Sequence, residues 1–315
     1  TPDHPEDGEY VHHVISDKWF AQKTGAWTDN CAYVAVGDIN ADGILDVVFS
    51  NSEKVGWPVV WYSVEAPAEA RTGRWQEHII APRFDWCETL QLGDVDGDGH
   101  LDVLAAKFER DRSDPKQTNA PPFPIVVFRN VKGDGSQWVP LEVSDTGTYA
   151  GMLGDVGSDG TLDIVGPHSY WIGPLELWEN RLAKLHANGG PRGATAGSTS
   201  EIRTLGSEMA QNSGSKLTPG ERLSLDQWHY IEVDHSRDKR FFGLAMGDVT
   251  GDGFADIASG QWFYRNPGGD MTGQWERTVV GEGLDSIAIV DVKGLGRNDI
   301  IALRPKEQFW VEAND

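Results

Sequence analysis

Short runs of hydrophobic residues, separated by glycine and aspartate, recur along the chain. Tyr33–Val36 and Leu244–Met246 are two such runs. Each leads into an Asp-rich loop, and a second β-prone run follows the loop, as in Asp46–Phe49 and Asp163–Val165. Short alternating runs bounded by tight-turn residues are typical of strand, loop and strand. The pattern therefore predicts a protein built of β-hairpins.

The Asp-rich loop occurs five times in aligned form. Four copies read Gly-Asp-x-x-x-Asp-Gly-x-x-Asp, and the fifth keeps the turn but has Leu295 at the central acidic position. Repetition of one structural unit at intervals of some tens of residues is the sequence signature of a solenoid or a propeller. We number the hairpin loops first to fifth; they are residues 37–46, 93–102, 154–163, 247–256 and 290–299.

Two further strands are expected after most of these hairpins. The third strand carries aromatic residues, as in Val59–Tyr62 and Trp262–Tyr264. The fourth begins with a tryptophan expected to pack between repeats, and these tryptophans are Trp75, Trp138, Trp228 and Trp275. Repeated four-stranded units of this kind form the blades of a β-propeller. The sequence predicts an all-β fold, a single β-propeller domain over residues 1–315 with five four-stranded blades.

The two ends of the chain suggest how the ring closes. Residues Tyr10–Ile15 resemble a fourth strand with no blade before it, and the last predicted strand, ending at Val311, is a third strand. We expect the N-terminal strand to complete the last blade, which removes an open edge. Residues 187–220 are rich in Gly, Ser, Thr and Ala and are expected to form a flexible insertion. A degenerate blade within that interval would raise the count to six or seven.

The spacing of the loop carboxylates is suited to calcium. Alternate residues of a tight loop point toward one centre, and Ca²⁺ takes six to eight oxygen ligands. Asp-Gly pairs also occur in ordinary turns, but four aligned copies favour about four structural Ca²⁺ sites. The predicted ligands are Asp38, Asn40, Asp42 and Asp46; Asp94, Asp96, Asp98 and Asp102; Asp155, Asp159 and Asp163; and Asp248, Thr250, Asp252 and Asp256.

Charge and composition limit the classes of molecule that the protein is expected to bind. The formal net charge of −22 argues against a nucleic-acid partner or an anionic membrane surface, since both need a basic footprint. Bound cations would account for part of this acidity. The chain has no apolar stretch long enough for membrane insertion as a helix.

The chain contains only two cysteines, too few for a disulfide framework. Cys31 and Cys87 lie at equivalent positions of their repeats, each seven residues before the first aspartate of its hairpin loop. A bridge between neighbouring blades and a pair of free buried thiols both fit this placement.

The hairpin loops resemble the FG-GAP/VCBS repeat family, which includes integrin α-subunit propellers and many secreted bacterial and fungal proteins. The resemblance covers most of the chain outside residues 187–220. It implies propeller blades, structural calcium in the loops, and an extracellular or periplasmic protein. It does not imply one activity, because the family includes adhesion proteins, lectins and polysaccharide-degrading enzymes.

A ligand site is expected on the face opposite the hairpin loops. That face carries the loops between second and third strands and the connections between blades, where variable residues gather. Aromatic rings can stack on sugars while cationic groups bind uronates. We therefore expect a monomer that binds a polysaccharide, another glycan or a protein. The predicted binding residues are Trp27, Trp57, Trp86, Lys107, Arg110, Tyr149 and Trp171.

An enzyme is the alternative. Propeller lyases of uronate-containing polysaccharides are related in architecture, and that resemblance implies His168 as base, Tyr170 as acid and Arg240 as a carboxylate clamp. Proton abstraction beside a carboxylate needs both a base and neutralisation of the developing enolate. His168 equally suits a polar rim position. A hydrolase using paired carboxylates such as Asp85 and Glu88 is a further possibility.

Overall fold

The computed structural model describes residues 13–16, 32–108, 122–169, 173–181, 228–237, 241–269 and 271–313. In these ranges the chain forms strands and one short helix, α1 (Pro67–Ala70). The all-β prediction is therefore confirmed. None of the described segments contains a helix with the length and apolar character needed to cross a bilayer.

The strands form five antiparallel sheets. The first contains β1 (Ala32–Gly37), β2 (Asp46–Asn51), β3 (Val59–Ser63) and β4 (Gln76–Ala81). The second contains β5 (Thr89–Gly93), β6 (Asp102–Ala106), β7 (Ile125–Asn130) and β8 (Trp138–Ser144). The third contains β9 (Met152–Gly154), β10 (Asp163–Pro167), β11 (Leu175–Asn180) and β12 (Trp228–Asp234). The fourth contains β13 (Leu244–Gly247), β14 (Asp256–Ser259), β15 (Trp262–Arg265) and β16 (Glu276–Val279), and the fifth β17 (Asp285–Val290), β18 (Asp299–Arg304) and β19 (Glu307–Val311).

The five hairpin loops have one register. The first residue of each loop pairs with its last aspartate, as Gly37 does with Asp46 and Val290 with Asp299. The same pairing occurs in the second, third and fourth sheets. Because successive strands are antiparallel, all five loops lie at the same end of their sheets. We call this end the hairpin face and the other end the opposite face.

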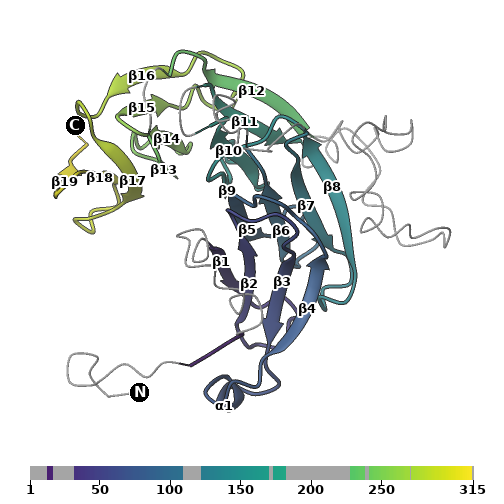
Figure 1. Cartoon of the computed structure of the whole chain (residues 1–315). Coiled ribbons are helices and arrows are strands. Elements are labelled where there is room, and N and C mark those ends of the chain that lie inside the picture. The colour runs from purple at the N-terminus through teal and green to yellow at the C-terminus, as the bar shows by residue number, and fades with distance from the viewer. Residues whose placement is uncertain are drawn as a thin grey trace, which may run out of the picture.

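The sheets follow one another along an arc (Figure 1). Their first strands, β1, β5, β9, β13 and β17, lie on the inner side of the arc, and each contacts the next along the chain. We call the face of a sheet that is directed toward the preceding sheet its near face, and the face directed toward the following sheet its far face. Four hydrophobic clusters fill these interfaces between sheets.

Three of the four tryptophans predicted to begin fourth strands pack in these clusters. Trp228 lies between the second and third sheets, and Trp275 between the third and fourth, both nearly fully buried. Trp138 packs against the cluster between the first and second sheets. Trp75 instead packs against Phe49, Val60 and Tyr62 on the near face of the first sheet, which no other described sheet covers.

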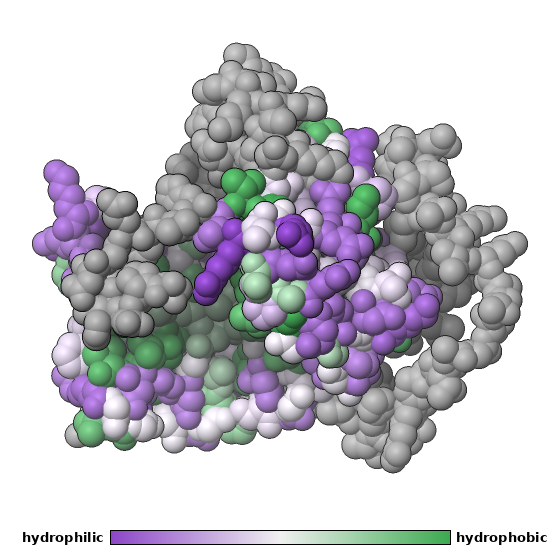
Figure 2. All heavy atoms as spheres, turned by 90° about the horizontal axis from the view of Figure 1, so that it is seen from below, coloured by the Kyte–Doolittle hydropathy of each residue, from purple (hydrophilic) through white to green (hydrophobic). Residues whose placement is uncertain are grey.

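Two sheet faces have no neighbouring sheet in the described residues. One is the near face of the first sheet, where Val34 and Val36 are 55% and 57% exposed. The other is the far face of the fifth sheet, where Trp310 is 49% exposed. The view from below shows hydrophobic side chains exposed in a recess of the surface (Figure 2). We call these two surfaces the open faces.

The expected closing strand is not found where the sequence placed it. The fifth sheet has three strands, and residues 13–15, the described part of that segment, form no strand. Ile15 instead lines an apolar hollow with Val34, Phe49 and Tyr62 on the near face of the first sheet. An uncovered hydrophobic surface attracts a hydrophobic segment without any strand pairing. Residues 10–12 lie outside the described part of the chain.

The long interval between the third and fourth hairpin loops is explained in part by topology. The strands on either side of residues 182–227 are β11 and β12, which pair with each other. The third sheet is therefore complete without the interval, as expected for an insertion. The predicted insertion, residues 187–220, lies outside the described residues, as would any further blade within it.

Candidate functional site

The first aspartate of each hairpin loop shapes the turn. Asp94 accepts hydrogen bonds from the backbone N–H of Asp98 (3.0 Å) and of Gly99 (2.9 Å). The fifth loop, which lacks the central acidic residue, keeps the same arrangement, with Asp291 accepting from Leu295 and Gly296. This geometry therefore belongs to the turn and is not by itself evidence of a metal site.

The last aspartate of each loop is buried, and in the second, third and fourth loops it links its own loop to the end of the third strand. Asp102 accepts from the N–H of Val95 (3.0 Å) in its own loop and of Asn130 (2.9 Å) at the end of β7. Burial raises the pKa of Asp102 and of Asp163 to about 7, although the same N–H donors act to lower it. The equivalent residues Asp163 and Asp256 have the same pair of backbone partners.

The second hairpin loop fits a hard cation best. Within the described chain, Asp94, Asp96 and Asp102 form the one group of three acidic or histidine side chains whose ligand atoms lie within 4.8 Å of one another. Asp96 Oδ1 is buried with no hydrogen-bond partner. A carboxylate oxygen that accepts one N–H keeps a second lone pair for a metal. These oxygen donors match the preference of Ca²⁺.

The other loops fit a cation less well. In the first, the amide of Asn40 donates to Asp42 Oδ2 (2.9 Å), so a nitrogen faces the acidic group. In the fourth, Thr250 Oγ1 is buried without a partner, while Asp252 lies 3.5 Å from Arg265. The predicted ligands of these loops remain predictions.

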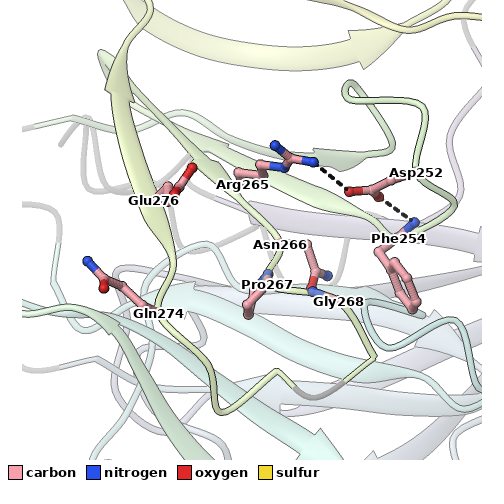
Figure 3. Close-up of a pocket in the computed structure, with 8 residues that line it drawn as sticks. All are labelled: Asp252, Phe254, Arg265, Asn266, Pro267, Gly268, Gln274 and Glu276. Carbon is pink, nitrogen blue, oxygen red and sulfur yellow. Dashed lines mark hydrogen bonds and ion pairs between the residues drawn. The ribbon is translucent and has the colours of Figure 1, made fainter.

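A polar hollow of about 340 Å³ lies beside the fourth hairpin loop (Figure 3). Asp252 and Arg265 approach each other across it, and Glu276 and Gln274 line its other side. The Asp252 carboxylate also accepts from the N–H of Phe254. The Asp252–Arg265 ion pair thus lies on the hairpin face, whereas the sequence predicts the ligand site on the opposite face.

On the opposite face, side chains from four sheets converge around Tyr149. Its ring contacts Phe108 edge-on, with centroids 5.1 Å apart, and lies 6.2 Å from the ring of Phe242, which is 47% exposed. Tyr33 lies close enough that burial, Tyr149 and Glu88 all raise its pKa. We call Tyr33, Glu88, Tyr149 and Phe242 the mouth cluster.

Two connections beside the mouth cluster have unusual backbone geometry. Trp86 and Ala150 have φ values of +58° and +47°, in the left-handed region that disfavours residues with a side chain. Hydrogen bonds hold both: Trp86 N–H donates to the carbonyl of Lys54 (3.1 Å), and Ala150 N–H to that of Glu88 (3.0 Å). Strained backbone of this kind concentrates at functional sites.

Of two further predicted binding residues, Lys107 borders this cluster and Trp57 lies apart from it: the Lys107 carbonyl accepts from the N–H of Thr148 (2.8 Å), next to Tyr149. Burial lowers the pKa of the half-buried Lys107, and the negative charge of Asp85 counteracts this shift. Asp85 already accepts from Arg83 (2.7 Å). Trp57 packs against the hydrophobic cluster on the near face of the first sheet. Trp57 is therefore not part of the mouth cluster.

His168 lies at the end of β10 beside a buried carboxylate. Its Nδ1 is 3.4 Å from Glu176 Oε2, and the Glu176 side chain is only 4% exposed. Tyr230 donates its hydroxyl to the other oxygen of Glu176 (3.1 Å). The backbone N–H of Tyr149 donates to the carbonyl of Pro167, so His168 is near the mouth cluster.

The structure describes five of the ten predicted catalytic and binding residues. It places Tyr149 and Trp86 at or beside the mouth cluster and His168 close to it. The others, Trp27, Arg110, Tyr170, Trp171 and Arg240, lie outside the described residues.

Sequence reasoning left Tyr33, Phe242 and Glu176 out of the site. The alignment of repeats contains a signal for Phe242: Glu88, Tyr149 and Phe242 stand at the same distance before their hairpin loops. Glu176 lies on β11 opposite Gly166 of β10, so the pairing of these adjacent strands, which the sequence predicted without a register, brings it beside His168.

Cys87 is a free, buried thiol. Its Sγ donates to the carbonyl of Thr89, and burial raises its pKa to about 12. The thiol is therefore protonated near neutral pH. Cys31, the other half of the considered bridge, lies outside the described residues.

Comparisons with known proteins assign no family. No family model matches the chain, and no curated protein matches it. Among solved structures, the biofilm matrix protein Bap1 of V. cholerae aligns with 86% of this chain and 34% of its own, at 12% identity and a TM-score of 0.38. The chain thus spans about a third of that protein's length, and a likeness at this level assigns neither a family nor an activity.

Proposed function

We propose that the chain is a calcium-stabilised protein with propeller-type blades that binds carbohydrate through the mouth cluster, outside the cytoplasm, in an extracellular or periplasmic location. The observation that carries this proposal is the contact of the rings of Tyr149 and the half-exposed Phe242, beside Tyr33 and the buried Glu88. These residues come from different sheets and meet on the face away from the repeated hairpin loops.

The chemistry of the cluster favours a sugar. Aromatic rings bury the apolar face of a pyranose, and carboxylates accept hydrogen bonds from hydroxyl groups. A protein loop that presents aromatic and polar groups is the alternative ligand of the same surface.

Affinity electrophoresis tests the sugar assignment. The chain is run in gels containing neutral or acidic polysaccharides, and at least one should retard it. Phe242→Ala and Tyr149→Ala should abolish the retardation. Trp310→Ala is a matched control, since Trp310 is as exposed as Phe242 (49% against 47%) but lies on an open face. Equal loss in all three variants, or no retardation by any polysaccharide, would contradict the proposal.

The propeller assignment is supported by the meander order of the sheets, their inner first strands and their face-to-face packing. The calcium assignment is supported most by Asp94, Asp96 and Asp102. Metal analysis of the purified protein should find calcium, and a chelator should lower the melting temperature. An unchanged melting temperature in metal-free protein would refute the calcium assignment.

A second candidate function, lyase activity on a uronate-containing polysaccharide, is favoured by the His168–Glu176 pair. A buried carboxylate 3.4 Å from one ring nitrogen favours the protonated form of the imidazole and leaves the other nitrogen for proton transfer. The test is absorbance of unsaturated uronate product. Product that disappears in His168→Ala and falls strongly in Glu176→Gln would support the lyase. Retardation by polysaccharide without product would support binding alone.

A further inference from the structure

Asn180, at the end of β11, connects two hairpin loops. Its backbone N–H donates to Asp163 Oδ1 of the third loop (2.8 Å). Its side-chain Nδ2 donates to the carbonyl of Val95 in the second loop (2.8 Å), which belongs to the preceding sheet. Asn180 is fully buried, so water does not compete for these bonds.

The same arrangement occurs three times. Asn130 joins Asp102 (2.9 Å) to the carbonyl of Ile39 (2.9 Å). Asn266 joins Asp256 (2.9 Å) to the carbonyl of Val156 (2.9 Å). We call Asn130, Asn180 and Asn266 the latch asparagines.

One residue of each loop completes the connection. Val95 receives the latch of Asn180 on its carbonyl and donates its N–H to Asp102, the last aspartate of its own loop (3.0 Å). Val156 does the same between Asn266 and Asp163 (3.0 Å). A continuous line of buried hydrogen bonds therefore runs through the first four loops.

The line ends where the repeat ends. In the fifth sheet the latch position is Ala313, whose backbone still donates to Asp299 but which has no side-chain amide. In the first sheet the same position is Val64, and Asp46 Oδ1 is buried without a partner. The latches therefore occur in the three sheets that have neighbours on both sides.

We propose that the first four hairpin loops bind Ca²⁺ as a coupled series and that the latch asparagines are the positioning residues that couple them. The inference rests on the calcium assignment made above. Ordering the third loop fixes Asp163, Asp163 fixes Asn180, and Asn180 fixes the backbone of the second loop at Val95. A group that holds ligand-bearing backbone in place changes metal affinity without touching the metal, and such coupling acts equally in both directions.

Calorimetric titration of the full chain with Ca²⁺ tests the series. The unmodified chain should show binding steeper than that of independent sites. Asp96→Ala removes a carboxylate from the acidic group of the second loop and so identifies the phase that belongs to that loop. Asn180→Ala should weaken that phase about tenfold, although Asn180 lies in another sheet.

Two further variants separate coupling from general damage. Asn180→Asp keeps the size of the side chain but lacks the Nδ2 donor, so it should weaken the second loop as Asn180→Ala does. Asn298→Ala removes a hydrogen bond of the same length (2.8 Å), which the side-chain Nδ2 of Asn298 donates to the carbonyl of Asp248. Asp248 belongs to the fourth loop, near the other end of the series. The effect of Asn298→Ala on the second loop should be much smaller.

The outcomes are distinct. Absence of any calcium phase in the unmodified chain would refute the calcium assignment itself. Calcium phases that behave as independent sites, or that Asn180→Ala and Asn180→Asp leave unchanged, would overturn the coupling alone. Equal weakening of the second loop by Asn298→Ala would also overturn it. If neither Asn180 variant folds, the steepness of the unmodified titration decides.

Discussion

Leu90 on β5 and Val34 on β1 occupy the same position in neighbouring sheets, yet Leu90 is 2% exposed and Val34 is 55% exposed. Leu90 packs in the cluster between the first and second sheets. Val34 lies on an open face, with no preceding sheet to cover it. The comparison extends to the far end, where Val127 is fully buried and its counterpart Trp310 is 49% exposed.

The end sheets also differ from the middle sheets in their buried polar bonds. Asp102 uses both carboxylate oxygens, whereas Asp46 in the first sheet has one oxygen without a partner. Asn130, Asn180 and Asn266 occur in middle sheets, while Val64 and Ala313 stand at the same position in the end sheets. The repeat thus specifies the strands of all five sheets, and the presence of a neighbour decides how much each position stabilises the fold.

The largest expected effect is at Leu90. Leu90→Ala removes packed atoms from a buried interface and should lower the free energy of unfolding by about 3 kcal/mol. Val34→Ala, at the equivalent open position, should change it by less than about 0.5 kcal/mol. Urea denaturation of both variants measures the difference. A large loss for Val34→Ala would mean that the open face is covered in solution, by ring closure or by another molecule.

The next largest effect is expected at the buried aspartates. Stability is measured in the presence of a chelator, so that bound metal does not contribute to it. Asp102→Asn leaves one of two buried N–H groups without its charged acceptor and should cost about 2 kcal/mol. Asp46→Asn should cost clearly less, since Asp46 Oδ1 has no donor to lose. Thermal denaturation of the two variants checks the order. Equal losses would mean that the first sheet has the same polar contacts as the second.

A smaller effect is expected from moving a latch. Asn266→Ala should lower stability by about 1 kcal/mol through loss of its bond to the Val156 carbonyl. Ala313→Asn places the missing amide in the fifth sheet and should raise stability by about 0.5 kcal/mol. Denaturant midpoints in chelator give both values. A loss of stability in Ala313→Asn would show that the fifth sheet cannot accept the arrangement of the middle sheets.

The smallest effect is a pH dependence in the first sheet. His78 on β4 stacks on Trp61 and contacts Ser63, and burial lowers its pKa. Because the folded pKa is below the unfolded value, the stability it contributes is present above about pH 6.5 and declines as pH falls below that value. The melting temperature of the unmodified chain should therefore fall more between pH 7.5 and 5.5 than that of His78→Gln. An identical fall in both would exclude His78 as the cause.

Much of the fold was determined by local sequence. Four Asp-Gly loops, a degenerate fifth and the alternating runs beside them predicted all five hairpins, because strands joined by a tight turn have little choice of partner. Trp228 and Trp275 were predicted to pack between repeats, and they do. The insertion was expected between the third and fourth loops, and β11 and β12 on either side of residues 182–227 pair directly.

Tertiary structure alone decided the environment of those elements and the composition of the site. The Tyr10–Ile15 segment reads as a closing strand, but Ile15 lies on the open face of the first sheet. Phe242 meets Tyr149 between the third and fourth sheets, residues that are far apart in the sequence. A repeat pattern encodes pairing between adjacent strands, whose contacts are close in sequence. Which faces are covered, and which side chains meet, depends on how the sheets pack, and that is a property of the assembled chain.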